Sequence, residues 1–140
     1  MSASTRLQSN TNVIQVTPQG PILHISFSGI YFDGVGQELG DYLVAALRQY
    51  QPAAVVLDFV HFRYRGGNDL GQIVHAFFTK GPDGKTIFRP CAIVASGRTA
   101  KALLSLLSLG RLLETFGLRF FEDVSPAAED LRARLDAGLS

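Results

Sequence analysis

Residues 55–71 read VVLDFVHFRYRGGNDLG, and the change in character along this stretch decides the fold. Residues 53–59 are apolar except for Asp58, which is the pattern of a parallel strand buried on both faces. Two arginines, two glycines, Asn68 and Asp69 follow, and apolar residues at helical intervals begin directly after them. The stretch therefore predicts a central strand that leads through a charged, glycine-containing turn into a helix.

The segments on both sides of this strand predict an α/β domain. Strands are predicted over residues 13–17, 21–29, 87–95 and 118–121, and the alternation within 21–29 indicates a hairpin with one wetter face. Helices are predicted over residues 35–50, 69–79 and 99–114, with a fourth beginning at Ser125 and Pro126. Residues 1–11 are polar and predict a flexible tail, so residues 12–140 form one domain. We expect a mixed sheet of four to five strands with about four helices packed on it.

Composition and charge argue against several classes of protein. The 140 residues are 46% apolar, which fits one domain with one good core. Thirteen basic and twelve acidic side chains leave a formal charge of +1, so we expect no general attraction to nucleic acid or to an anionic membrane. The sequence shows no targeting segment, and we expect a cytoplasmic protein. Cys91, the only cysteine, lies in the apolar run CAIVA and is expected to be a small buried hydrophobe.

No catalytic or metal-binding constellation stands out. His24, His61 and His75 lack the spacing of metal ligands and lie near no cluster of cysteines or carboxylates in the sequence, so we expect surface or edge positions and no metal. Ser105 and Ser108 lie on the polar side of a leucine-rich helix, where neither has an activating partner. The sequence implies no cofactor, and the chain is expected not to be an enzyme.

Element order, length and two motifs together resemble the STAS domain, the fold of bacterial anti-sigma factor antagonists. The core segment of that family reads roughly LDLSGVTFIDSSGLG, and residues 57–71 here, LDFVHFRYRGGNDLG, have the same length, opening and close. Gly29 and the pair Glu38-Leu39 are similar to an earlier family pattern, and residues 103–131 resemble the last helix, strand and helix. The resemblance covers about residues 12–137 and implies a regulatory module in partner-switching signalling. Its implied partner is an anti-sigma factor, a related kinase or another signalling protein.

The chain departs from the family at the position that family members phosphorylate. Where they carry Asp-Ser-Ser or Asp-Ser-Thr, this chain has Gly66, Gly67 and Asn68, and Asp69 stands where the family usually has glycine. The hydroxyl that accepts the phosphate is therefore missing. Asp69 fits a helix N-cap and also sets a fixed negative charge near the missing phosphate, with one charge instead of nearly two. We expect no phosphorylation at this turn.

The predicted partner-binding surface is centred on this turn. In an extended chain Arg63 and Arg65 point to one side and Phe62 and Tyr64 to the other, so the arginines form a small cationic edge. A solvated strand end would look the same in sequence. The predicted contact residues are Arg63, Arg65, Gly66, Gly67, Asn68, Asp69 and Leu70, and Tyr31, Asp33, Ser96 and Arg98 of neighbouring loops complete the surface.

Three further possibilities stay open at the level of sequence. Leu104 and Leu109 lie off the core stripe of their helix and would suit a homodimer contact. Arg63, Arg65 and the glycine turn would suit a sensor that holds a nucleotide or another anion. The segment GGNDL is also similar to the oxyanion-hole turn of crotonase-type enzymes that act on acyl-CoA, although those chains are nearly twice as long.

Overall fold

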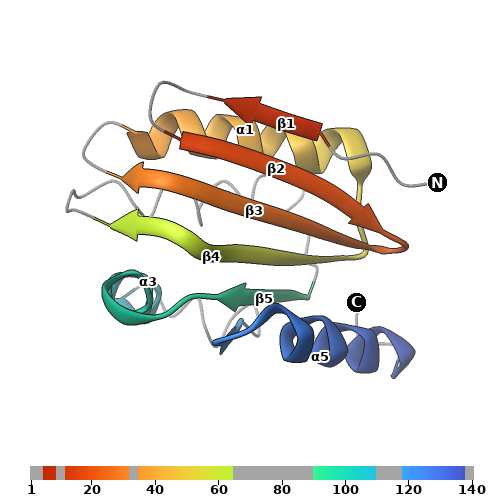
Figure 1. The fold of residues 1–140 in the computed structure, drawn as a ribbon. Coiled ribbons are helices and arrows are strands. Elements are labelled where there is room, and N and C mark those ends of the chain that lie inside the picture. The colour runs from red at the N-terminus through yellow and green to blue at the C-terminus, as the bar shows by residue number, and fades with distance from the viewer. Residues whose placement is uncertain (1–4, 9–11, 32–34, 65–89, 110–117, 138–140) are drawn as a thin grey trace.

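A computed structural model of the protein describes residues 5–8, 12–31, 35–64, 90–109 and 118–137. Within these ranges six strands form one sheet and three helices pack on it (Figure 1). The strands are β1 (Thr5–Gln8), β2 (Asn12–Gln19), β3 (Ile22–Tyr31), β4 (Ala54–Tyr64), β5 (Cys91–Val94) and β6 (Arg119–Phe121). The helices are α1 (Val35–Tyr50), α3 (Gly97–Leu109) and α5 (Val124–Asp136).

The sheet is mixed, and its strands lie side by side in the order of the sequence, β1-β2-β3-β4-β5-β6. Strands β1, β2 and β3 pair antiparallel, and a turn at Gly20, with φ of +64°, joins β2 to β3. Strands β3, β4, β5 and β6 pair parallel. The predicted central strand is therefore correct: β4 lies between two parallel neighbours, and it continues to Tyr64, beyond its apolar part.

One face of the sheet carries the larger core. Alternate residues of β2, β3 and β4 point to this face because successive side chains of a strand point to opposite sides. Helix α1 covers them with the stripe Leu39, Leu43, Ala46 and Leu47, and Ala100 and Ala102 of α3 pack against the same cluster. The helical stripe predicted for residues 35–50 is thus the side of α1 that is buried.

The opposite face carries a smaller core beneath α5. Ala127 and Leu131 of α5 pack against Val56 of β4 and Val94 of β5. Cys91 of β5 belongs instead to the larger core, where it is fully buried, and burial raises the pKa of its thiol despite the nearby charge of Arg134. The predicted role of Cys91 as an inert buried hydrophobe is confirmed by this environment.

The amino-terminal segment differs from its prediction. Residues 1–11 were expected to form a flexible tail, but Thr5–Gln8 form β1 and pair with Val13–Val16 of β2. Residues 5–8 form a strand because the outer edge of β2 presents backbone N–H and C=O groups, and a further strand can form hydrogen bonds with them. This added strand raises the count from the expected four to five to six. The predicted helix over residues 69–79 lies outside the described residues.

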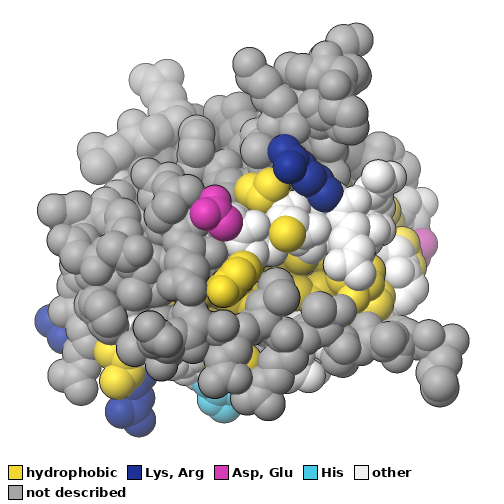
Figure 2. Space-filling model, turned by 90° about the horizontal axis from the view of Figure 1, so that it is seen from above, with side chains coloured by type: hydrophobic (Ala, Val, Ile, Leu, Met, Phe, Trp, Pro, Cys, Tyr) yellow, Lys and Arg dark blue, Asp and Glu magenta, His cyan; other side chains and the backbone are white. Residues whose placement is uncertain are grey.

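None of the helices in the described ranges is long and apolar enough to cross a membrane. On the side of the molecule seen from above in Figure 2, the described basic and acidic side chains appear as isolated spots and not as one continuous charged surface.

Candidate functional site

The parallel strands β3 and β4 end together, and this shared end is the candidate site. Tyr31 pairs with Tyr64 at the last rung, and Ile30 pairs with Arg63 one rung before it. Helix α3 begins at Gly97, just after β5, so that its first turn comes to the same end of the sheet (Figure 1). We call Ile30, Arg63, Ser96 and Arg98 the carboxyl edge, since ligands of parallel sheets commonly bind at the carboxyl ends of strands.

Arg63 reaches solvent because successive side chains of β4 point to opposite faces of the sheet at this point. Its neighbour Phe62 is 5% exposed and packs in the larger core, whereas Arg63 is exposed. The opposite orientations of these two residues agree with the extended chain expected from the sequence. Arg63 therefore presents a guanidinium group beside the start of the predicted turn, where it is available to a carboxylate or phosphate of a partner.

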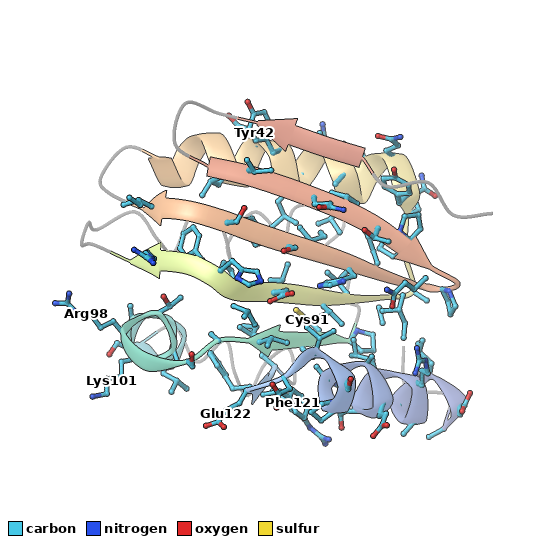
Figure 3. All side chains as sticks on the ribbon, in the orientation of Figure 1. Tyr42, Cys91, Arg98, Lys101, Phe121 and Glu122 are labelled. Atoms are coloured by element: carbon cyan, nitrogen blue, oxygen red, sulfur yellow. The ribbon has the colours of Figure 1, made fainter. Side chains whose placement is uncertain are left out.

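A hydrogen bond fastens the first turn of α3 to the end of β4. The Oγ1 of Thr99 donates to the carbonyl oxygen of Phe62 at 3.5 Å, and Thr99 is buried. Gly97 precedes it with φ of +60°, a conformation that favours glycine. The tight start leaves Ser96 and Arg98 exposed, and in Figure 3 the side chains of Arg98 and Lys101 project away from α3. The first turns of α3 thus add two cations near the carboxyl edge.

Several residues of the predicted surface are not described by the structure. Arg65, Gly66, Gly67, Asn68, Asp69 and Leu70 lie outside the described residues, as does Asp33 of the loop before α1. Tyr31 is described through its backbone pairing alone. Of the predicted contact set, the structure therefore brings Arg63, Ser96 and Arg98 to one end of the sheet, and the role of the turn itself stays a prediction.

A cluster of three aromatic rings supports the carboxyl edge from within the core. Phe27 and Phe59 stack with ring centroids 4.7 Å apart and planes 6° from parallel. Phe62 meets both rings edge-on, with centroids 6.3 Å from Phe27 and 5.3 Å from Phe59. The pairing of β3 with β4 shifts register here, between Ser26 and Ser28, and the extra residue of β4 lets both Phe59 and Phe62 face the core.

The extra residue makes a β-bulge in β4. On the other face of β4, beside this bulge, Asp58 is a buried carboxylate whose contact with a histidine the sequence did not reveal. Asp58 is 6% exposed; its Oδ1 accepts a hydrogen bond from the backbone N–H of Val60 at 3.0 Å, and its Oδ2 lies 2.9 Å from Nε2 of His24. His24 was expected at a surface or edge position; it is half-buried, and its ring contacts this single carboxylate. The two residues are 34 positions apart, so only strand pairing brings them together.

The surroundings of Asp58 keep it ionised. Burial by itself raises the pKa of this carboxyl, but the hydrogen bonds from His24 and Val60 and the nearby charges of His24 and His61 outweigh it. The net result is a lowered pKa. Among the described residues no group of three or more histidine, cysteine or acidic side chains is placed to hold a metal ion. The carboxylate of Asp58 therefore joins His24 of β3 to the backbone of the bulge at Val60.

Comparison with known proteins identifies the fold. No protein-family model matches the chain, and no curated protein matches it. Among solved structures, an anti-sigma factor antagonist from Mycobacterium paratuberculosis matches with a TM-score of 0.64 and 19% sequence identity. The match covers 90% of this chain and 99% of that chain. The STAS-like α/β fold predicted from the sequence is confirmed.

Proposed function

We propose that this chain is a non-catalytic regulatory module that binds a protein partner, in the manner of an anti-sigma factor antagonist. The observation that carries the proposal is the fold shared over 90% of the chain with such an antagonist. The exposed side chains of Arg63 and Arg98 at the carboxyl edge support it, because β4 ends there and the predicted contact turn over residues 65–70 follows β4 in the sequence. The partner is an anti-sigma factor, a related kinase or another signalling protein of the cytoplasm.

The proposed contact surface joins the carboxyl edge to the turn over residues 65–70. Arg63 and Arg98 would pair with carboxylates of the partner, and Ile30, which is 41% exposed, would supply apolar area beside Arg63. Leu104 of α3 is 40% exposed and would suit a contact between two copies of the chain. Sedimentation of the purified protein over a range of concentrations decides whether that second contact forms.

The first prediction concerns Arg63. We expect Arg63→Glu to weaken partner binding about tenfold, because the change replaces an attraction with a repulsion of similar size. The partner is captured from the source cell with the native chain as bait, and its Kd is then measured by calorimetry. Arg65→Glu is expected to act in the same direction. The melting temperature should stay nearly constant, because Arg63 is exposed.

Arg132→Glu is the matched control for this experiment. Arg132 is an exposed arginine on α5, next to Leu131, which packs in the cluster that includes Ile22 and Ala54 at the starts of β3 and β4 and not at their carboxyl ends. An equal loss of affinity in both variants would mean a general charge effect and would contradict the proposed surface. Titration with nucleotides and with acyl-CoA in the same calorimeter tests the ligand-sensor and acyl-CoA alternatives, and binding of either would favour a different function.

The second prediction concerns regulation. We expect no phosphate on the turn over residues 65–70 after incubation with ATP and the kinase of the same pathway, because Gly66, Gly67, Asn68 and Asp69 offer no hydroxyl. Intact-mass spectrometry of the native chain checks this. Gly67→Ser supplies the missing acceptor and is the positive control. Phosphate mapped to the turn of the native chain would overturn the proposal that the module binds constitutively.

A further inference from the structure

One face of the sheet is only partly covered by a helix. Helix α5 packs on β4, β5 and β6 and reaches Ile22 at the start of β3, and within the described part of the chain no helix lies over β2 or the rest of β3 on that face (Figure 1). Strand register brings three cross-strand pairs together there: Gln15 with Ser26, Ser28 with His61, and Ile30 with Arg63. We call these six residues the open face. Gln15, Ile30, His61 and Arg63 are exposed, and the two serines are half-buried.

The charge that the open face offers to solvent is of one sign. The carboxylate behind it, Asp58, is buried and already paired with His24, so it is not available to a partner. Arg63 carries a permanent positive charge, and the imidazole of His61 is exposed beside it on the same strand. None of the six residues is acidic. The open face is therefore complementary to carboxylates and not to cations.

The shape of the open face also narrows the kind of partner. Its centre consists of the short side chains Ser26 and Ser28, two residues apart on β3, so no long side chain rises from the middle of this face. Ile30 adds exposed apolar area at the end nearest Arg63. Such a surface accommodates a chain segment that lies across the strands. A second copy of the open face would set like charges against each other, which disfavours a symmetric dimer through it.

We propose that the open face is a docking surface for an acidic segment of a partner protein, one that combines carboxylates with apolar side chains. This inference rests on the proposed function, since it takes the partner to be a protein, and it adds a second surface that is continuous with the carboxyl edge through Ile30 and Arg63. A partner that contacts both surfaces would wrap around the ends of β3 and β4.

The test uses the full chain and a short synthetic peptide in which glutamates alternate with valines. Gln15 is replaced once by an acidic and once by a basic residue. It is suitable because it is exposed and because its replacement by Glu is isosteric. We expect Gln15→Glu to weaken peptide binding about threefold and Gln15→Lys to tighten it about threefold, with both effects reduced at high salt. Gln49→Glu and Gln49→Lys are matched controls, since Gln49 is exposed on α1 at the opposite face, and they should leave the Kd unchanged.

Nuclear magnetic resonance of the isotope-labelled chain locates the peptide. The expected result is that the amide shifts cluster on Ser26, Ser28 and Ile30, and that a peptide with lysine in place of glutamate produces none. No shifts on these strands, equal shifts with the lysine peptide, or equal responses of the Gln15 and Gln49 variants would each overturn the proposal. Shifts that depend on protein concentration without peptide would assign the face to self-association and would also overturn it.

The partner captured with the native chain separates this inference from the proposed function. Suppose that a partner is captured, that Arg63→Glu and Arg98→Glu weaken its binding, and that both Gln15 variants leave its Kd unchanged. The proposal that the open face is a docking surface is then wrong, and the proposed function stands. If no protein partner is captured, the proposed function fails, and the peptide titration still decides whether the open face binds acidic segments.

Discussion

Replacing Phe59 with alanine is expected to lower the free energy of unfolding by about 3–5 kcal/mol, which is the usual cost of removing a fully buried aromatic ring. Phe59 is 2% exposed and stacks on Phe27, and Phe62 meets both rings edge-on. The truncation removes the stacked contact and leaves a cavity in the larger core, over β3 and β4. Urea unfolding at constant pH measures the loss.

The neighbouring residue provides the control for this experiment. Val60 is 49% exposed, so Val60→Ala should change the free energy of unfolding by no more than about 0.5 kcal/mol. Phe59→Leu keeps most of the buried volume and should cost about 1–2 kcal/mol, mainly through the lost stacking. A cost below about 1 kcal/mol for Phe59→Ala would mean that the ring is not packed as described.

The same substitution connects stability to the proposed function. The carbonyl of Phe62 accepts the hydrogen bond from Thr99, so the aromatic cluster lies directly behind the start of α3. A cavity at Phe59 loosens the support of the carboxyl edge, and partner binding should weaken even under conditions where the variant is still folded. Arg63→Glu is expected to differ from Phe59→Ala, because it should weaken partner binding without lowering the free energy of unfolding.

Much of the fold could be predicted from the sequence because its signals are local. The apolar run of β4 and the stripe of α1 each occur within a single segment, and burial of those side chains dominates the folding free energy. The short strand predicted over residues 118–121 corresponds to β6, and the helix start predicted at Ser125 and Pro126 corresponds to α5, which begins at Val124. These parts required no knowledge of which strands pair.

The features that the sequence did not reveal depend on pairing between distant segments. Strand β1 forms because β2 has a free backbone edge, and backbone hydrogen bonding leaves no hydrophobic pattern in the sequence. The contact of His24 with Asp58 depends on the register of β3 against β4. The one local signal was Asp58 itself, a lone acidic residue in an apolar strand, because a buried carboxylate requires a partner.

The candidate site was predictable in outline only. The alternation of Phe62 and Arg63 could be inferred from strand geometry, and the structure shows one residue buried and the other exposed. The open face could not be inferred, since it depends on α5 covering β4, β5, β6 and the start of β3 but not β2 or the rest of β3. How far a helix extends over a sheet is decided by tertiary packing and not by local sequence.

The second large effect is expected at Asp58. Asp58→Ala should lower the free energy of unfolding by about 2–3 kcal/mol near neutral pH, because it removes the acceptor for the Val60 N–H and leaves His24 without its partner. Asp58→Asn should cost less, since its amide oxygen can still accept from Val60. Comparing the two variants by urea unfolding separates the loss of the hydrogen bond from the loss of the charge.

The charge of Asp58 also predicts a dependence on pH with a definite sign. Because the pKa of Asp58 is lowered from 3.8 in the folded protein, its ionised form stabilises the fold above that pH, and this contribution is lost as the pH falls through the folded pKa. The difference in unfolding free energy between the native chain and Asp58→Asn should therefore shrink as the pH falls below about pH 4. A difference that stays the same down to pH 2 would show that the carboxylate charge does not stabilise the bulge, and that Asp58 acts there only as a hydrogen-bond acceptor.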